Sequence, residues 1–414
     1  MSLTSRSASG LRIVDPWPRQ AALRWVVELA PAYLVALLIL PWVISYGQAW
    51  PWQPSTIDLQ VYVYAVRDML AGKDIYATTT PFWNLYFIYP PIAAILMVPL
   101  AVGPYWLWQL IWTFLLVWAQ QSVLKRCGVP RGWVLGLIGI AVVLAVEPIR
   151  TTLGYGQVNT MLMALVVADL LPDRPDVRRR IPRGTLIGLA AAIKLTPALF
   201  VVFAFLLGRK RMAWTAIISF GAFTLIGAIF QWSQTWQFWF GLSGGNTRTA
   251  SPLYVGNQSF LGVVARVLGE GTALTLLGLA IGGLVALLGT VVASQWWRAG
   301  EKVFAVALVG LCTCLASPLS WTHHYVWILP MGAAVVLGRN LPTWVRLLGG
   351  AWVVWVCACL PLAVLPYGGD PERNYNLGQQ LIANAGPLMG VALVIGLGWQ
   401  MLVAHRKRAT AAVH

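Results

Sequence analysis

Charged side chains are scarce in this chain, making up 10% of its 414 residues, against roughly a quarter in a soluble protein. The longest stretches without Asp, Glu, Lys or Arg are 29–57, 75–124, 212–247, 271–297, 303–338, 347–369 and 374–405. Each can hold a membrane-spanning helix, which needs about 20 mostly apolar residues. With a mean hydropathy of +0.70, these runs argue against a soluble protein and predict an all-α, polytopic membrane protein.

Signatures of nucleotide, metal and redox sites are absent as well. The chain contains no P-loop, no Gly-x-Gly-x-x-Gly, no His-Glu-x-x-His and no Cys-x-x-Cys. Its five Cys lie mostly in apolar runs, and the i,i+2 pairs Cys312/Cys314 and Cys357/Cys359 do not face each other on a helix. The sequence therefore predicts no cofactor, no metal site and no disulfide framework, and a sugar nucleotide is a poor candidate substrate.

The net charge of +16 is confined to short clusters between the apolar runs. These clusters are Arg6 to Arg24, Lys125 to Arg131, Arg174 to Arg183, Arg209 to Arg211, Arg298 with Lys302, Arg339 with Arg346, and Arg406 to Arg408. Lys and Arg beside spans mark the cytoplasmic side. We therefore expect both termini in the cytoplasm of a cell-membrane protein, and no nucleic acid partner.

The apolar runs predict about twelve membrane-spanning helices in one transmembrane domain, residues 26–404. Residues 1–25 are expected to form a cytoplasmic segment and 405–414 a basic cytoplasmic tail. The first run, 26–46, is long enough to span and is expected to be retained rather than cleaved as a signal. Further spans are expected near 133–147, 157–171, 184–194, 197–207, 212–231, 271–293, 303–317, 325–338, 347–366 and 387–404.

Two regions are predicted to contain broken helices. Residues 91–124, interrupted by Gly103-Pro104, are predicted to cross once after a kinked first part. The runs 184–194 and 197–207 are predicted to form a hairpin, since helix breaks are tolerated where they face protein or a water-filled cavity. The segments left on the outer side are 47–90, 148–156, 232–270, 318–324 and 367–386, and the polar motifs lie on or beside them. Within 47–90, residues 58–71 predict an amphipathic helix on the membrane surface, with Val61, Tyr64, Ala65 and Met69 on one stripe.

Three polar motifs are candidates for chemistry at the outer boundary. Asp58 can accept the proton of a sugar hydroxyl, although it can equally cap the surface helix. His323 and His324, two of only four His, suit a phosphate or proton transfer with Asp58; the alternative is a capped helix end. Lys194, a lone charge between apolar half-helices, suits a lipid phosphate, unless it merely extends to the membrane surface.

Other polar residues lie on neighbouring outer motifs. Gln157 and Asn159, and likewise Asn257 and Gln258, offer the neutral donors and acceptors that sugar hydroxyls prefer. Glu147 and Arg150 flank a span end, where a structural i,i+3 ion pair is the alternative.

An acidic residue after the first span is followed, in order, by Phe87-Ile-Tyr-Pro-Pro91, Gly156-Gln-Val-Asn159, Ala192-Ile-Lys-Leu-Thr-Pro197, Gly256-Asn-Gln-Ser259 and Ser317-Pro-Leu-Ser-Trp-Thr-His-His324. Each motif is short, and the specificity lies in their order. Together they resemble the actinobacterial polyprenyl-phosphomannose-dependent mannosyltransferases of the GT-C superfamily, notably those that build phosphatidylinositol mannosides. The resemblance covers residues 58–324 without a departure from the pattern.

The resemblance implies a metal-independent enzyme in the lipid bilayer with its active site on the outer face. Asp58 would act as general base in one inverting displacement, moving mannose from polyprenyl-phosphate-mannose to a phosphatidylinositol mannoside acceptor in α-1,2 linkage. The implied donor-phosphate residues are His323, His324, Lys194, Arg266 and Arg150. The implied sugar or acceptor residues are Gln157, Asn159, Asn257, Gln258, Glu147 and Tyr62.

Two alternatives stay open. A sister enzyme would be a lipomannan-branching mannosyltransferase or an arabinofuranosyltransferase, which these residues do not distinguish from the first candidate. A transporter of lipid-linked sugars should show two related halves and a site at the membrane midplane. The sequence shows no internal repeat, and its polar residues gather at one boundary.

Overall fold

The computed structural model describes residues 21–46, 56–81, 83–171, 179–241, 251–368 and 370–411. Most of the predicted segment 1–25, residues 47–55 of the first outer loop and the last residues of the predicted tail lie outside this described part. The described chain is helical apart from its connections and one isolated β-bridge between Thr79 and Tyr86. The predicted all-α class is confirmed.

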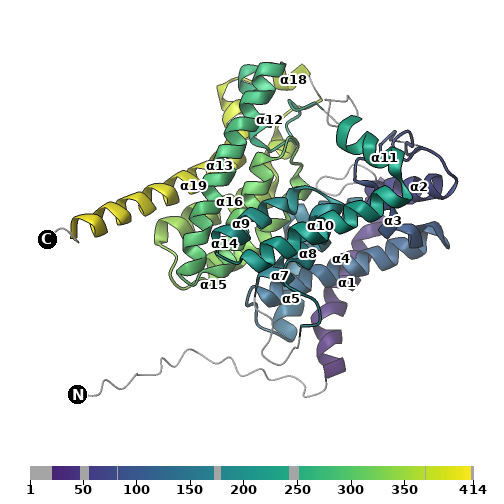
Figure 1. Ribbon diagram of the computed structural model, residues 1–414, viewed down its shortest axis with the longest axis horizontal. Helices are drawn as coiled ribbons and strands as arrows, with labels where there is room; N and C mark the ends of the chain where they lie inside the picture. The colour runs from purple at the N-terminus through teal and green to yellow at the C-terminus, as the bar shows by residue number, and fades with distance from the viewer. Residues whose placement is uncertain are drawn as a thin grey trace.

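The helices of the first half are α1 (Ala21–Tyr46), α2 (Ile57–Leu70), α3 (Pro91–Leu96), η1 (Val98–Ala101), α4 (Tyr105–Arg126), α5 (Trp133–Ala145), α6 (Glu147–Tyr155), α7 (Asn159–Leu170), α8 (Thr185–Ile193), η2 (Thr196–Ala198) and α9 (Leu199–Leu206). Those of the second half are α10 (Lys210–Phe230), α11 (Trp232–Trp236), η3 (Gln237–Gly241), α12 (Phe260–Leu268), α13 (Thr272–Arg298), α14 (Lys302–Ala316), η5 (Thr322–Trp327), α15 (Ile328–Leu337), α16 (Thr343–Ala358), α17 (Leu360–Val364), α18 (Asp370–Arg373) and α19 (Leu377–Ala411). Figure 1 shows α2, α3 and α11 gathered at one end, and α19 leading out of the bundle to the C-terminus.

Four helices of the described chain are long and apolar enough to cross a membrane: α4, α10, α13 and the part of α19 from Leu377 to Val403. A fifth crossing arises if α5 and α6, which are bent by 79° relative to each other, form one broken span. Helices occupy the other predicted spans, but α7, α14 and α16 have only 12, 15 and 16 residues. The structure thus fits a polytopic membrane protein, whereas the predicted count of about twelve crossings is not confirmed.

Both predicted helix breaks are present. Gly103, at φ +81°, and Pro104 separate α3 and η1 from α4, and α4 alone in this run has the length of a span. The second break lies at Lys194, between α8 and η2. Arg183 before α8 and Arg209 after α9 line the same cavity, so the chain reverses direction at this break.

The predicted amphipathic helix is confirmed as α2, but its surroundings differ from the prediction. In addition to Val61, Ala65 and Met69 of the predicted stripe, α2 buries Leu59, Tyr62, Val63 and Val66. α3, η1 and α6 pack against it, and Ile75, Tyr76 and Phe87 of the segment that follows are fully buried in the same core. Protein therefore encloses α2 on more than one face, which fixes the direction of its first turn.

Candidate active site

Asp58 lies in the first turn of α2, where the helix dipole favours a carboxylate. Thr56, the N-cap, has φ 48° and ψ 44° and makes no side-chain capping bond; this left-handed conformation is strained for a β-branched residue. Its Oγ1 lies 2.5 Å from Tyr105 Oη and accepts from Gln109 Nε2 at 2.9 Å. Its backbone N–H donates to Gly154 O at 2.7 Å. Bonds from α4 and α6 therefore hold the strained residue that starts α2.

The turn between α6 and α7 approaches α2 very closely at Gly156. This residue has φ +70°, and a Cβ there would stand 2.8 Å from the Leu59 Cβ. Both the backbone conformation and the contact thus require glycine. Trp112 Nε1 donates to the Gly156 carbonyl at 2.7 Å. The turn is thereby held against α2, and it delivers Gln157 and Asn159 to the space beside Asp58.

Gln157 connects Asp58 to a pair of buried tyrosines. Its Oε1 accepts from Tyr62 Oη at 3.1 Å and from Tyr89 Oη at 3.0 Å, and the two hydroxyl oxygens lie 3.2 Å apart. Because both hydroxyls occupy the carbonyl side of the amide, its NH₂ side is directed to Asp58, with which Gln157 also forms a hydrogen bond. The tyrosine pair thus orients the amide that holds the carboxylate.

The electrostatic surroundings of Asp58 suit a proton acceptor. Burial raises the pKa of Asp58 to about 7, although the hydrogen bond from Gln157 and the positive charge of Lys194 oppose the rise. A carboxyl group whose pKa lies near the working pH can accept a proton in the transition state and release it afterwards.

Lys194 lies at the break between α8 and η2, half-buried and surrounded by polar groups. Its Nζ donates to Asn159 Oδ1 at 3.0 Å and lies 3.0 Å from His324 Nε2. It also lies over the Tyr89 ring, 5.7 Å from the centroid, a cation–π geometry. Lys194 is therefore directed into the polar cluster that contains Asp58 and does not extend to the membrane surface.

The two adjacent imidazoles have different surroundings. Burial and the charge of Lys194 lower the pKa of His323 and of His324. His324 Nδ1 accepts from Trp321 N at 3.3 Å, and its Nε2 faces the Lys194 amine. His323 Nε2 is buried and has no hydrogen-bond partner in the described part of the chain. Its ring packs edge-on against Tyr155, with centroids 5.2 Å apart, and its backbone carbonyl accepts from Asn159 Nδ2 at 2.9 Å. Both imidazoles thus lie in the cluster, and a ligand could engage His323 Nε2.

The space left at this cluster is small. A cavity of about 30 Å³ lies between Asn159, Lys194, Ser320 and His324, which is room for roughly one water molecule. This cavity is by itself too small for a phosphosugar. Among the described residues, no group of three or more His, Cys, Asp or Glu is arranged to hold a metal ion.

Arg266, Asn257 and Gln258 form a separate group beside the cluster. Arg266 Nε donates to Asn384 Oδ1 at 2.9 Å and its Nη1 to the Asn257 carbonyl at 2.8 Å. Asn257 Oδ1 accepts from Ser320 N at 2.9 Å, and Gln258 Nε2 donates to the backbone of α19 at 3.1 Å. These bonds join the 252–258 segment to α19 and to the turn before His323. Arg266 Nη2 is buried without a hydrogen-bond partner in the described chain, and the contact of these residues with substrate stays a prediction.

Glu147 and Arg150 lie in the first half of α6, towards the α5–α6 bend. Glu147 is buried and accepts from Thr151 Oγ1, while Arg150 Nη1 donates to Leu144 O at 3.0 Å. The charges of Glu147 and Arg150 act on each other, and Glu147 Oε2 is buried without a hydrogen-bond partner in the described chain. Tyr155, at the far end of α6, lies within electrostatic reach of both Glu147 and Asp58.

Sequence reasoning missed two residues of this site. Tyr89 bonds to Gln157 and lies under Lys194, and Tyr155 packs on His323. Both stand inside or beside quoted motifs, Tyr89 in Phe-Ile-Tyr-Pro-Pro and Tyr155 next to Gly-Gln-Val-Asn. The position of the two tyrosines in or beside these motifs is the sequence feature that could have identified them as site residues.

Comparisons with known proteins agree with the geometry. The sequence profile of glycosyltransferase family 87 matches residues 87–318. A polyprenol-phosphate-mannose-dependent alpha-(1-2)-phosphatidylinositol mannoside mannosyltransferase of Mycobacterium tuberculosis is 32% identical over 313 residues, 69% of this chain and 70% of the relative. A protein of the same name from Mycolicibacterium smegmatis is 31% identical over 406 residues, 87% of each chain.

A polyprenol-phosphate-mannose-dependent alpha-(1-2)-phosphatidylinositol pentamannoside mannosyltransferase of M. smegmatis is 30% identical over 394 residues, 90% of this chain and 91% of the relative. No solved structure matches significantly. The family profile covers more than half of the chain and includes Gln157, Asn159 and Lys194. From the profile and these relatives, we conclude that this chain belongs to glycosyltransferase family 87.

Proposed function

We propose that this protein transfers mannose from polyprenyl-phosphate-mannose to a phosphatidylinositol mannoside, forming an α-1,2 linkage with inversion. The observation that carries the proposal is the meeting of Asp58, Lys194 and the His323/His324 pair, which come from separate parts of the chain, in one polar cluster. Relatives that agree with the chain over most of their length carry this donor and this type of acceptor in their names.

In the proposed reaction, Asp58 is the general base. The mannose 2-hydroxyl of the acceptor attacks C1 of the β-linked donor, its proton passes to the Asp58 carboxylate, and the bond from C1 to the phosphate oxygen breaks. The products are an α-mannoside and polyprenyl phosphate. The raised pKa of Asp58 and the Gln157 hydrogen bond support this role.

The leaving phosphate needs compensation for the negative charge that develops on it. Lys194 is the cation of the cluster, and His323 Nε2 is a buried ring nitrogen that lacks a partner in the described chain. We assign both to the donor phosphate, with His324 holding Lys194 in place. Tyr254 and Trp321, whose rings pack 5.5 Å apart, are candidates for stacking on acceptor sugars.

We further propose that the chain crosses the membrane about twelve times, with both termini in the cytoplasm and the Asp58 cluster on the outer face. The positions of the charged residues around α8 support this topology. The Lys194 break follows the C-terminus of α8, whereas Arg183 and Arg209 line a cavity near its N-terminus, as expected for a cytoplasmic end. An impermeant thiol reagent applied to intact cells should label Trp83→Cys and leave Arg180→Cys unlabelled. Labelling of Arg180→Cys and not of Trp83→Cys would show that the Asp58 cluster lies on the cytoplasmic face.

Transfer by the purified protein in detergent is the direct test. Radiolabelled polyprenyl-phosphate-mannose and decaprenyl-phosphate-arabinose are each supplied with a phosphatidylinositol mannoside, and Asp58→Asn serves as the inactive control. The proposal expects mannosylated product that an α-1,2-mannosidase cleaves. Transfer of arabinose alone would indicate the sister enzyme. Absence of any transfer, combined with movement of the sugar lipid across liposomes, would indicate a transporter.

Lys194→Met tests the phosphate role separately. Loss of a hydrogen bond to a charged group costs about 1.5–3 kcal/mol, so kcat/KM for the donor should fall about 10- to 100-fold, while the KM for acceptor changes little. Lys73→Met, which removes an exposed cation from the connection after α2, is the matched control. Equal losses for donor and acceptor would contradict the assignment.

A further inference from the structure

A second polar region lies at the opposite ends of the helices that carry the active-site residues. α7 runs from Asn159 at the Asp58 cluster to Leu170, and α8 runs from Gly184 to the Lys194 break. Leu170 and Arg183 border an open cavity of about 780 Å³, within the size range of small-molecule sites. The two regions are thus connected by continuous helices.

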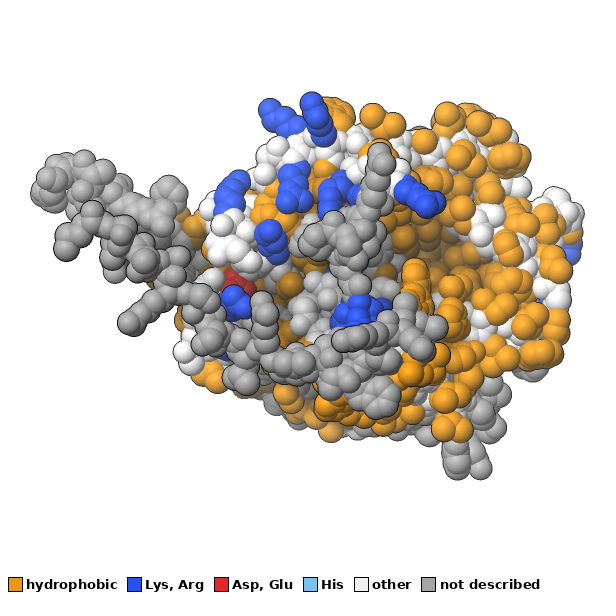
Figure 2. All heavy atoms as spheres, turned by 90° about the horizontal axis from the view of Figure 1, so that it is seen from below, with side chains coloured by type: hydrophobic (Ala, Val, Ile, Leu, Met, Phe, Trp, Pro, Cys, Tyr) orange, Lys and Arg blue, Asp and Glu red, His pale blue; other side chains and the backbone are white. Residues whose placement is uncertain are grey.

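Cationic side chains dominate the polar lining of this cavity. They are Arg183, Arg209, Lys210, Arg211 and Lys302, and no Asp or Glu is among the residues that line it. Figure 2 looks onto the lower face of the molecule, where Lys and Arg side chains gather beside a hollow bordered by hydrophobic side chains. Such a combination of cations and apolar groups suits an amphiphilic anion.

Two of the cations lie close together around one aromatic ring. The Arg209 guanidinium lies 4.8 Å and Lys302 Nζ 5.8 Å from the centroid of the buried Trp297 ring. Burial and the neighbouring charge of Arg183 lower the pKa of Arg209. Like charges confined in this way repel one another, and a bound anion would relieve the repulsion.

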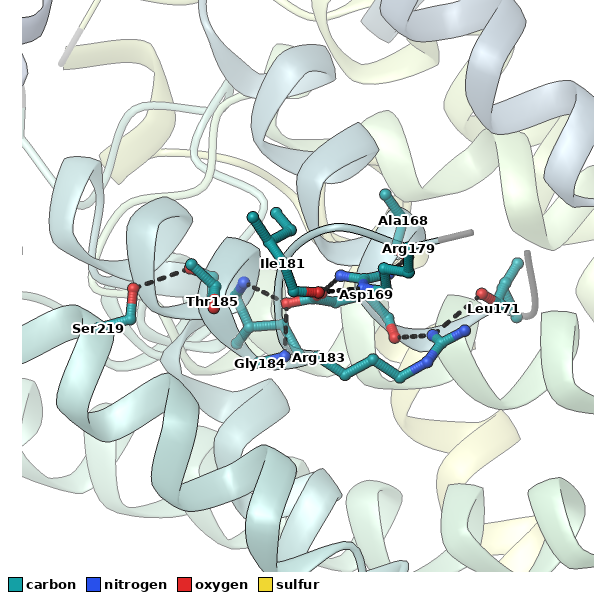
Figure 3. A network of polar contacts seen from close by, with 10 residues as sticks. Ala168, Asp169, Leu171, Arg179, Ile181, Arg183, Gly184, Thr185 and Ser219 are labelled. Atoms are coloured by element: carbon teal, nitrogen blue, oxygen red, sulfur yellow. Dashed lines mark hydrogen bonds and ion pairs between the residues drawn. The ribbon is translucent and has the colours of Figure 1, made fainter. Parts of the chain in front are cut away.

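The nearby carboxylate of Asp169 does not neutralise these cations, because it is bonded to other groups in the wall of the cavity. Figure 3 shows its carboxylate paired with Arg179 and accepting from the backbone N–H of Gly184. The distance to Gly184 N is 2.9 Å, and Ile187 N also donates at 2.9 Å. Arg183 in turn donates to the backbone carbonyl of Asp169. The network fixes the start of α8 and holds Arg183 at the edge of the cavity.

Glu301, which precedes Lys302, is also occupied elsewhere. Its Oε1 accepts from Arg339 N at 2.9 Å and from Asn340 N at 2.7 Å. Among the described residues, the carboxylates of Asp169 and Glu301 are therefore bound to other partners, and the described lining of the cavity carries a net positive charge.

We propose that this cavity binds the phosphate of an anionic glycerophospholipid headgroup, on the membrane face opposite the Asp58 cluster. The cations would hold the phosphate, while Leu170, Met212 and Trp297 would contact the glycerol and the upper acyl chain. The proposal rests on α7 and α8 lying across the bilayer and not on the transfer reaction.

Lipid retention by the full chain tests the proposal. The purified protein, exchanged into a zwitterionic detergent, is titrated with phosphatidylglycerol, with phosphatidylcholine or with inorganic phosphate, and the bound species are counted by native mass spectrometry. The pocket variant is Arg209→Gln with Lys302→Gln. The control variant is Arg180→Gln with Arg339→Gln, both exposed and outside the lining. Each cation near a membrane surface strengthens the binding of an anionic lipid about fivefold, so loss of two cations should weaken the binding of phosphatidylglycerol about 30-fold.

Selective retention of phosphatidylglycerol by the wild type and the control variant, lost in the pocket variant, would support the site. Equal weakening in both variants would overturn it, because general surface charge would then explain the binding. Displacement of the lipid by inorganic phosphate at equal concentration would also overturn it in favour of a free-phosphate site. Thermal unfolding in lipid-free detergent checks that the pocket variant is folded. If that variant is unfolded, Lys302→Gln alone is used, with the same outcomes.

Discussion

Replacement of Asp58 by Asn separates the chemistry of this carboxylate from its effect on stability. Asn keeps the shape of the side chain and can still accept the hydrogen bond from Gln157, but it cannot take up a proton. Removal of a general base lowers turnover about 10²- to 10⁴-fold. In the wild type, the raised pKa of Asp58, about 7, predicts that kcat/KM falls as the pH drops below neutrality.

The same substitution should stabilise the fold at neutral and alkaline pH. The pKa of Asp58 in the folded protein, about 7, lies above its usual value of 3.8, so the folded state binds the proton more tightly than the unfolded chain. The stability linked to that proton is fully present below about pH 4 and is lost as the pH rises to about 7. At about 1.36 kcal/mol per pKa unit, the loss amounts to about 4 kcal/mol. This is an upper bound, since the half-buried carboxylate is still partly hydrated.

Thermal unfolding of both proteins in detergent between pH 4 and pH 8 measures this linkage. The stability advantage of Asp58→Asn over the wild type should grow from pH 4 to about pH 7 and level off above it. Asp68→Asn, at the other end of α2, where Asp68 pairs with Lys73 and Thr78, is the control and should keep its activity. A stability difference that does not change with pH, or near-normal turnover by Asp58→Asn, would refute the reasoning.

Two further substitutions test how Asp58 is positioned. Gln157→Leu removes the hydrogen bond that holds the pKa of Asp58 down, so the acidic limb of kcat/KM should move up by about one pH unit, with about fivefold lower activity at pH 7. An unchanged limb would show that Gln157 does not act through Asp58. Gly156→Ala introduces a Cβ against Leu59 at φ +70°, and chemical or thermal denaturation should show a greater loss of stability than Gly72→Ala. At Gly72, φ is +73° with open space around it, so only a backbone cost of about 1–2 kcal/mol is expected. Equal losses of stability in Gly156→Ala and Gly72→Ala would show that the contact between Gly156 and Leu59 can accommodate a Cβ.

The location of helices was predictable because the signals are local. Apolar runs and breakers such as Gly103-Pro104 act within a few residues, and most helices begin and end close to the predicted bounds. The exceptions are the predicted span 347–366, which is divided between α16 and α17, and α19, which begins at Leu377 within the predicted outer segment 367–386. The number of crossings was less accessible, because several apolar helices are shorter than a bilayer is thick. Which of these short helices combine into one crossing depends on tertiary packing.

Which residues form the candidate site was also partly predictable from the sequence. Asp58, Lys194 and the His323/His324 pair were selected for polarity at a membrane boundary, and the structure brings them together; their roles remain proposals. Tyr89 was missed because an aromatic residue in an outer loop reads as a membrane anchor until its hydroxyl partner is known. The partners of Arg266, which are backbone carbonyls and Asn384, could not be found from the sequence, because no sequence pattern reveals them.

The contact between Gly156 and Leu59 constrains the construction of chimeras. α2 does not form an independent module, since its first turn is seated on the α6–α7 turn and tied to α4 through Thr56. A loop graft that carries only 56–90 into a relative would separate Asp58 from the residues that orient it. Exchanges of acceptor preference between relatives should therefore move residues 56–90 together with 105–109 and 154–159 as a single unit.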